Sequence, residues 1–190
     1  KTEVMEMLNN PTEYPLVDGN AAINYSPVNS DILLQPLTTN TTTLRQALQE
    51  GPNFYATDYM LNKVMKPAND PRIPVFYDKF GETKDNKFIP NKEYKAMPIT
   101  FTENELLSNY QKYSIIDSAT FFDNKYLPGI VTTASETNFN KAEAYLRWGS
   151  DVRAKNAYDV ASKESLSIYY YLDNLMGTEG LKAETIPAED

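Results

Sequence analysis

The 190-residue sequence predicts a mainly α-helical protein in which paired helices carry long irregular loops and a few short strands. Two observations predict the helices. Residues 133–149 form an amphipathic segment with a capping signal at each end, and a longer segment of the same kind follows almost at once. A third observation predicts the loops, because prolines and polar runs interrupt most of the chain before residue 133.

The N-terminal third of the chain contains two segments with helical character. Residues 2–8 place apolar side chains on one side of a short helix. Residues 53–66 form a second predicted helix, which Asn53 can cap and which Pro67 ends. Between them, residues 28–34 are expected to hold a short strand or turn.

Residues 67–132 are predicted to form a loop-rich excursion from the helical scaffold. Residues 73–77 are predicted to be an extended or edge-strand segment, since prolines restrict the residues before them to extended geometry. Residues 81–91 are predicted to be a charged, polar loop that turns as a hairpin, and residues 94–101 to form a further short strand. Loops longer than about 15 residues are unusual in compact domains and are often functional.

The helix predicted over residues 133–149 has both ends marked in the sequence. Thr133 and Glu136 have the spacing of a capping box, and Gly149 is expected to take the left-handed conformation that closes a helix. The apolar side chains that follow the helical period are expected to face the core, and they are Phe139, Ala142 and Leu146.

The following helix can be capped by Ser150 or Asp151 and ends at Gly177, so residues 133–176 are predicted to form a helix hairpin. Its apolar stripe is rich in alanine and is interrupted only by Glu164. Small residues let helix axes approach closely, as in tetratricopeptide-like pairs. The sequence nevertheless has no 34-residue self-similarity, which a true tetratricopeptide array would show.

Composition excludes several classes of function. The formal net charge of −8 argues against binding to nucleic acid, whose phosphates need a basic face. The chain has no cysteine and no histidine, which excludes disulfides, thiolate metal sites, a Ser-His-Asp triad and imidazole acid–base chemistry. It also has no glycine-rich phosphate loop. No cofactor and no metal are therefore expected.

Carboxylates are the remaining catalytic candidates, and those in the loop-rich region are Asp70, Asp78, Asp117 and Asp123. Glycosidases use two carboxylates at a defined separation, which the sequence does not give. Asp70 precedes Pro71, where a carboxylate commonly forms an Asx turn, and this structural role is the favoured one. We therefore predict no catalytic residue.

Aromatic residues are in excess, at 12% of the chain with 14 tyrosines. A tyrosine ring offers a flat apolar face and a hydrogen-bonding tip, which suits sugar rings and protein partners equally well. The aromatic residues of the loop-rich region predicted to bind a ligand are Tyr77, Phe121, Phe122 and Tyr126. Packing in a local core is the alternative role for the same rings.

Two motifs in order resemble a known family. Asn69-Asp-Pro-Arg-Ile-Pro-Val-Phe-Tyr77 is followed, after an insert, by Leu127-Pro-Gly-Ile-Val-Thr-Thr-Ala-Ser-Glu-Thr-Asn-Phe-Asn-Lys-Ala-Glu-Ala-Tyr-Leu-Arg-Trp-Gly149. This arrangement resembles SusD/RagB-type outer-membrane lipoproteins of Bacteroidetes, over roughly residues 54–175. Members of that family are much longer, so residues 1–190 are expected to be a single internal region of a larger SusD-like domain.

The resemblance implies a surface-exposed lipoprotein of the outer membrane that binds glycan or another nutrient without catalysis. It implies delivery of the ligand, a polysaccharide or oligosaccharide or a peptide, to a SusC-type TonB-dependent transporter. The lipid anchor of the family is absent from these residues. Two alternatives stay open at this point: a subunit that docks to the transporter without binding glycan itself, and a fragment of a glycoside hydrolase.

Overall fold

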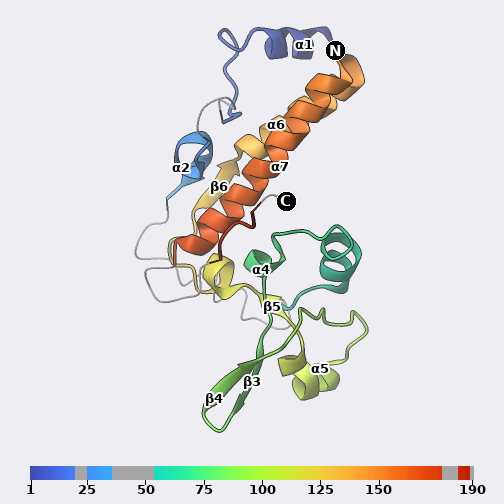
Figure 1. The fold of residues 1–190 in the computed structure, drawn as a ribbon, viewed down its shortest axis with the longest axis vertical. Coiled ribbons are helices and arrows are strands. Elements are labelled where there is room, and N and C mark those ends of the chain that lie inside the picture. The colour runs from blue at the N-terminus through green and yellow to red at the C-terminus, as the bar shows by residue number, and fades with distance from the viewer. Residues whose placement is uncertain (20–24, 36–53, 177–183, 189–190) are drawn as a thin grey trace. The chain divides into compact units, whose positions relative to one another are not determined.

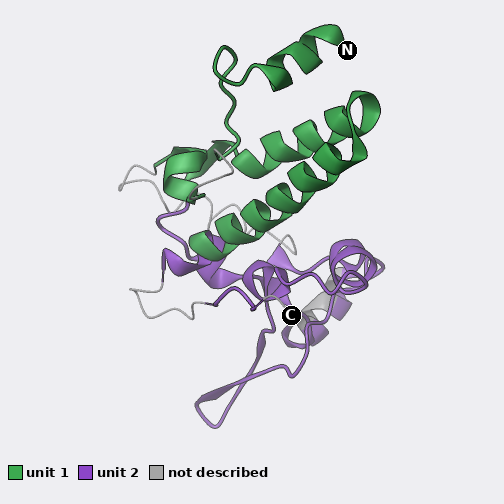
Figure 2. Ribbon diagram, turned by 45° about the horizontal axis from the view of Figure 1, so that its top comes forward, with its two compact units in different colours: residues 1–35, 128–171 green, residues 36–127, 172–190 purple. Residues whose placement is uncertain are grey.

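The computed structural model describes residues 1–19, 25–35, 54–176 and 184–188. The chain divides into two compact units, coloured separately in Figure 2. Unit 1 comprises Lys1–Gln35 and Pro128–Tyr171, and unit 2 comprises Pro36–Leu127 and Leu172–Asp190. In the described residues helix outweighs strand, which confirms the mainly α-helical class. A tetratricopeptide-like arrangement of the helices stays a prediction.

The helix hairpin of unit 1 begins as the sequence predicts. Helices α6 (Ala134–Trp148) and α7 (Asp151–Asn174) lie side by side (Figure 1). The Thr133 hydroxyl caps α6 by accepting a hydrogen bond of 3.0 Å from the Glu136 amide. This bond satisfies one of the amides that a helix N-terminus leaves without an intrahelical partner.

The end of α6 is closed differently from the prediction. The Gly149 amide donates to the Tyr145 carbonyl at 2.8 Å, but its φ of −114° lies outside the left-handed region. The left-handed assignment was therefore wrong. Glycine fits here because the chain passes close to Tyr145, and a Cβ at position 149 would lie 3.0 Å from its ring and 3.1 Å from its Cα.

The buried face of α6 also differs from the predicted apolar stripe. Leu146 is 67% exposed, whereas Asn138 is buried. The observed face is shifted around the helix, and the buried residues of α6 are Ala134, Ser135, Asn138, Ala142, Ala144 and Tyr145. The buried residues of α7 likewise include polar ones, and they are Ala154, Ala157, Ala161, Glu164, Ile168, Tyr170, Leu172 and Asp173.

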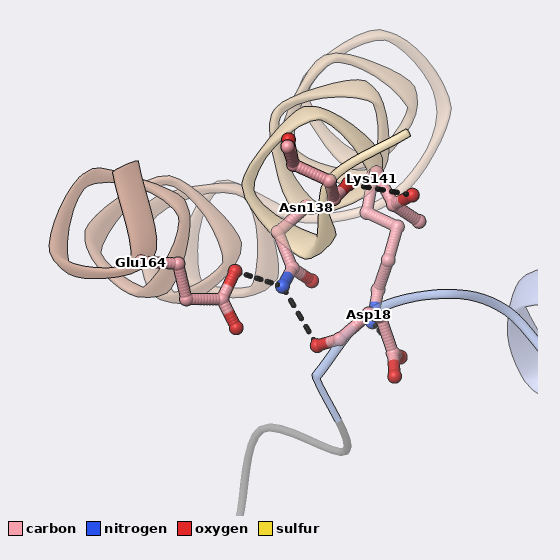
Figure 3. Close-up of polar contacts among 6 residues, drawn as sticks. Asp18, Asn138, Lys141 and Glu164 are labelled. Carbon is pink, nitrogen blue, oxygen red and sulfur yellow. Dashed lines mark hydrogen bonds and ion pairs between the residues drawn. The ribbon is translucent and has the colours of Figure 1, made fainter. Parts of the chain in front are cut away.

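Asn138 and Glu164 belong on these buried faces because they contact each other (Figure 3). The Asn138 side-chain amide donates to the Glu164 carboxylate at 2.8 Å and to the Asp18 carbonyl at 2.9 Å. Lys141 forms an ion pair of 2.7 Å with the Asp18 carboxylate. Burial, with the nearby charges of Asp31 and Asp18, raises the pKa of Glu164. The residue that interrupts the apolar pattern thus belongs to a polar cluster in which Asn138 joins Glu164 to Asp18.

The N-terminal segment covers part of the hairpin. Helix α1 (Thr2–Asn9) places Met5 and Leu8 against a core cluster of unit 1. The buried members of this cluster are Ala142, Tyr145, Ala154 and Ala157.

A short helix and a two-stranded ribbon complete unit 1. Helix α2 (Pro27–Ser30) leads into β1 (Ile32–Leu34), which pairs antiparallel with β6 (Gly129–Thr132). Asp31, just before β1, accepts a hydrogen bond of 2.7 Å from the Ala134 amide and so links the ribbon to the start of α6.

Unit 2 is assembled from short elements around a small core. Its buried members are Ala56, Leu61, Met65, Tyr77 and Ala96. The elements in chain order are η2 (Tyr59–Met65), α4 (Ile73–Phe76), β2 (Tyr77–Asp78), β3 (Gly81–Lys84), β4 (Lys87–Pro90), α5 (Glu103–Asn109), η3 (Tyr110–Lys112), β5 (Ile115–Ile116) and η4 (Ser118–Phe122).

Several boundaries in unit 2 differ from the sequence-based expectation. The helix expected over residues 53–66 is the π-helical segment η2, and the proposed Asn53 cap lies outside the described residues. The extended segment expected over residues 73–77 is instead one helical turn, α4, before β2 begins. Pro74 is compatible with this turn because proline is tolerated in the first turn of a helix. Residues 94–101 hold only an isolated bridge through Met97.

The predicted hairpin over residues 81–91 is confirmed. Strands β3 and β4 pair antiparallel up to Lys84 opposite Lys87, and Asp85 and Asn86 form the turn. Both turn residues have positive φ, 51° and 60°, which is the signature of the type I′ turn that matches strand twist. The hairpin extends from the body of unit 2 (Figure 1).

Candidate ligand-binding pocket

Unit 2 contains a pocket of about 860 Å³. Its size falls within the range of roughly 300–1,000 Å³ that ligand sites occupy. Both aromatic and polar side chains line it. The aromatic lining is Tyr77, Phe80, Phe88 and Tyr94, and the polar lining is Asp78, Lys79, Asn91, Lys92, Asp117, Ser118 and Glu184.

One wall of the pocket is the antiparallel pair of β2 and β5. Tyr77 lies opposite Ile116, and Asp78 lies opposite Ile115. Tyr77 is a buried core residue, and burial raises the pKa of its hydroxyl. Tyr77 therefore belongs both to the core of unit 2 and to the lining of the pocket.

The β3–β4 hairpin forms a second wall, and its base is held firmly. The Asn91 amide donates to the Phe80 carbonyl at 2.7 Å. The Asn91 side chain donates to the carbonyls of Lys79 at 3.0 Å and Gln111 at 2.8 Å. These bonds fix the hairpin against its neighbours, so its exposed ring at Phe88, 57% accessible, is presented from a rigid base.

The backbone is strained at Phe80, just before the hairpin begins. Phe80 has a φ of 56°, which is an outlier for a bulky residue because the left-handed conformation brings Cβ close to the following carbonyl. Such strain costs roughly 1–3 kcal/mol and persists where the surroundings impose it, often at functional sites. Phe80 lines the pocket, so this observation is consistent with a functional site there.

The acidic groups of the pocket are held by η4. The Asp78 carboxylate accepts from the Ser118 amide at 2.9 Å and from the Ser118 hydroxyl at 2.7 Å. Asp117 accepts from the Thr120 amide at 2.7 Å and so caps η4. Burial, with the neighbouring charge of Asp78, raises the pKa of Asp117 to about 7.

The structure brings together two of the candidate carboxylates, Asp78 and Asp117, at one pocket. The others have separate roles: Asp70 forms an ion pair of 2.6 Å with Arg72, and Asp123 follows the last residue of η4. Burial raises the pKa of Asp70, but its hydrogen bonds and ion pair with Arg72 outweigh that effect and lower it overall. Asp70 thus has the turn role that the sequence favoured.

The aromatic residues predicted to bind ligand are distributed over unit 2. Tyr77 lines the pocket, whereas the described lining does not include Phe121, Phe122 or Tyr126. Phe121 packs edge-on against Phe76, with ring centroids 5.7 Å apart. Phe122 is half-buried, while Tyr126 is 40% exposed on the surface.

Sequence reasoning missed the aromatic residues contributed by the hairpin and its flanks, namely Phe80, Phe88 and Tyr94. The signal was present, because the hairpin itself was predicted and Phe88 lies within it. Because the region was interpreted as a charged, polar loop, Phe88 was not considered as a ligand-binding residue. Lys79 lies 5.2 Å from the centroid of the Tyr94 ring, a cation–π contact that orients this ring.

In the described part of the chain, no group of acidic, histidine or cysteine side chains is arranged to hold a metal ion. No described helix is long and apolar enough to cross a membrane.

Comparison with known proteins gives one extensive match. A family model described as SusD-like, starch-binding proteins associating with the outer membrane, matches residues 1–183. The match covers nearly the whole chain, including both motifs that carried the resemblance.

The other comparisons are limited. The chain is similar to Potassium channel K1 of Plasmodium berghei (strain Anka), at 28% identity over 174 residues. The aligned region covers 90% of this chain but spans about 8% of the length of that curated relative. A likeness of this extent carries no inference about family or function. No solved structure matches the chain.

Proposed function

This chain belongs to the SusD/RagB-like family, whose members are described as starch-binding and associated with the outer membrane, and from that premise we propose that the pocket of unit 2 binds glycan. One observation carries the assignment to this pocket: aromatic rings and polar side chains line the same cavity of about 860 Å³. Members of the family are described as starch-binding, and we propose that the site in this chain is the pocket of unit 2.

The chemistry of the lining supports a sugar ligand. Sugar rings present apolar C–H faces and hydroxyl edges, so a site needs flat apolar surfaces beside hydrogen-bonding groups. Phe88, Phe80 and Tyr94 supply ring surfaces, while Lys79 and Lys92 supply donors. Flexible polar ligands lose much of this gain to ordering and desolvation, so we expect modest affinity.

We propose that the pocket binds without catalysis. Asp78 and Asp117 share one cavity, and the pKa of Asp117 is raised as in the acid of a glycosidase pair, but each carboxylate already accepts hydrogen bonds from η4. Asp117 caps η4, and Asp78 binds Ser118 at the start of η4, so both carboxylates have structural roles. A carbohydrate-binding family is consistent with this role.

The wider role follows from the family. We propose that the protein is a surface lipoprotein that delivers its ligand to a SusC-type TonB-dependent transporter, with helices α6 and α7 as a tetratricopeptide-like scaffold. Association of the family with the outer membrane supports the location.

Calorimetric titration with soluble starch oligosaccharides tests the proposal. Phe88→Ala is expected to weaken binding by about 1 kcal/mol, roughly fivefold in Kd, because it removes an exposed ring from the pocket. Tyr59→Ala is the matched control, since Tyr59 is another exposed ring of unit 2 and is not part of the described lining. Its Kd should stay unchanged.

Tyr126→Ala separates this pocket from the site predicted from the sequence. If Tyr126→Ala weakens binding and Phe88→Ala does not, the ligand site lies at the surface loop instead. If no starch oligosaccharide or other glycan binds while a SusC-type transporter is retained in a pull-down, the protein acts only as a docking subunit.

A further inference from the structure

Residues 10–19 of unit 1, which we call the N-terminal strap, are held to the helix hairpin near both ends. The strap continues from helix α1, which packs on the hairpin through apolar side chains. At the other end, the Asp18 carbonyl accepts a hydrogen bond of 2.9 Å from the Asn138 side chain, and the Asp18 carboxylate forms an ion pair of 2.7 Å with Lys141. The first attachment is therefore apolar and the second is polar.

Asn138 joins the strap to Glu164 of α7. Its side-chain amide donates to the Asp18 carbonyl and also, at 2.8 Å, to Oε2 of Glu164 (Figure 3). A side-chain amide has two hydrogens to donate, so both are used. Asn138 is 1% exposed, so water has little access to these bonds. The strap and the Glu164 carboxyl group therefore share one donor.

The other oxygen of Glu164 lies beneath the strap backbone. Glu164 is almost fully buried, and no group of the described residues donates a hydrogen bond to its Oε1. A Cβ added at Gly19 would lie 2.5 Å from this oxygen, so the backbone of Gly19 closes over it. Gly19 has a φ of 73°, in the left-handed region that glycine adopts without strain. The docked strap thus covers a carboxyl oxygen without giving it a hydrogen bond.

The surroundings of Glu164 favour its protonated form. Burial is the largest cause of its raised pKa, and the carboxylates of Asp31 and Asp18 act in the same direction. The Lys141 ammonium acts in the opposite direction, but it is already paired with Asp18. The Tyr25 hydroxyl donates to Asp31 at 2.8 Å. The docked strap therefore suits a neutral Glu164 better than a charged one.

We propose that Glu164 is a proton-operated latch: the N-terminal strap stays docked while Glu164 is protonated, and its Asp18–Gly19 end loosens when Glu164 ionises. Loosening admits water to Oε1, and water supplies the donors that the docked strap lacks. The apolar packing of α1 does not titrate, so we expect α1 to stay in place. The latch belongs to unit 1 and does not depend on glycan binding by unit 2.

The sign of the pH dependence follows from linkage between docking and protonation. Because docking raises the pKa of Glu164, the docked state holds a proton that the loosened state releases. Docking is therefore strongest below the ordinary glutamate pKa of 4.5 and weakens as the pH rises through the raised value.

Spin labelling measures the mobility of the strap directly. The chain has no cysteine, so Glu13→Cys creates a single attachment site on an exposed residue of the strap. Electron paramagnetic resonance spectra should show a ratio of mobile to immobile label about fivefold higher at about pH 8 than at about pH 4.5, the order expected when a buried acceptor lacks a donor. A label at Glu143→Cys, on the exposed side of α6, is the control and should not respond to pH.

Two variants, each carrying the label at position 13, assign the change to Glu164. Glu164→Gln keeps an oxygen that accepts from Asn138 but does not ionise, so the label should stay immobile at both pH values. Asn138→Ala removes the amide that holds the strap, so the label should be mobile at both. Helical circular dichroism shows that each variant is folded.

The results distinguish a latch from a contact that does not respond to protons. A label whose mobility stays constant or falls as the pH rises, without any substitution at Glu164, overturns the proposal. An increase that persists in Glu164→Gln also overturns it, because Asp18 or Asp31 would then be the responsible group. The first of these measurements needs neither variant, so it decides against the latch even where a variant does not fold.

Discussion

At the scale of single residues, the most informative position is Glu164. It is 3% exposed, and its environment contains the carboxylates of Asp18 and Asp31 together with the cation of Lys141, which is already paired with Asp18. Asp31 has a raised pKa as well, because it is also buried. A charged carboxylate is costly in such surroundings, and the residue shifts toward its protonated form.

Replacing Glu164 with glutamine is expected to change how stability depends on pH. Because the folded state raises the pKa of Glu164, it retains a proton that the unfolded chain releases. The free energy of unfolding therefore falls as the pH rises from the ordinary glutamate pKa of 4.5 through the raised value. Glutamine does not ionise, so Glu164→Gln should gain stability relative to the unsubstituted protein across that window.

Urea unfolding at several pH values from about 4 to about 8 measures this difference. Glu143→Gln is the control, because Glu143 is an exposed residue of α6 in a surface ion pair with Arg147. Its difference should stay within about 0.5 kcal/mol at every pH. A Glu164→Gln difference that shrinks as the pH rises would contradict the assignment.

At the scale of elements, the β3–β4 hairpin depends on its first residue. Gly81 pairs with Pro90, and a Cβ at position 81 would overlap the Ile89 carbonyl oxygen and lie 2.8 Å from the Cα of Pro90. Both obstacles are backbone atoms, so no side-chain rotation relieves them. The hairpin carries Phe88 and Pro90, which line the candidate pocket, so Gly81 supports the wall of the pocket that the hairpin contributes.

Gly81→Ala is expected to lower the free energy of unfolding by about 1–3 kcal/mol, as overpacking does elsewhere, and to weaken glycan binding at the same time. The control is Gly129→Ala, where the nearest atom to an added Cβ is the Leu34 Cβ at 3.4 Å, an ordinary contact. Denaturant unfolding and calorimetry of both variants provide the measurement. Equal stability of the two variants would show that the hairpin adjusts without cost.

Some elements could be predicted because their signals are local. The Thr133 cap and the 81–91 hairpin each depend on residues a few positions apart, and both were predicted correctly. The core-facing stripe of α6 was right at Ala142 but wrong at Phe139 and Leu146. The burial of Asn138, which the stripe did not include, depends on Glu164, 26 positions away. The α4 turn was missed because the same prolines that favour extended chain before them are compatible with the first turn of a helix.

At the scale of the whole molecule, acidic groups dominate the charge and its pH response. The formal net charge is −8, and the buried carboxyls Asp31, Asp117 and Glu164 all have raised pKa values. Each of these groups favours the folded state when it is protonated. The effects add in the same direction as the general self-repulsion of a negatively charged chain.

We therefore expect the protein to lose stability as the pH rises from about 4 to about 7. For Asp117 this window lies between its ordinary pKa of 3.8 and its raised value of about 7. Asp117→Asn can still accept from the Thr120 amide but does not titrate, so it should reduce the slope of stability against pH. Thermal unfolding of both proteins at several pH values measures the slope, and stability that rises with pH over this range would contradict the expectation.

The sequence by itself determined the helical class, the capped helix hairpin, the β-hairpin and the family, because each rests on short-range pattern or on motifs in fixed order. The tertiary structure alone decided the candidate site. Tyr77 precedes and Tyr94 follows, in the sequence, the hairpin that carries Phe88. The three rings share a pocket only because β2 pairs with β5 and Asn91 fixes the hairpin base. Distances between such segments depend on long-range packing, which local pattern does not encode.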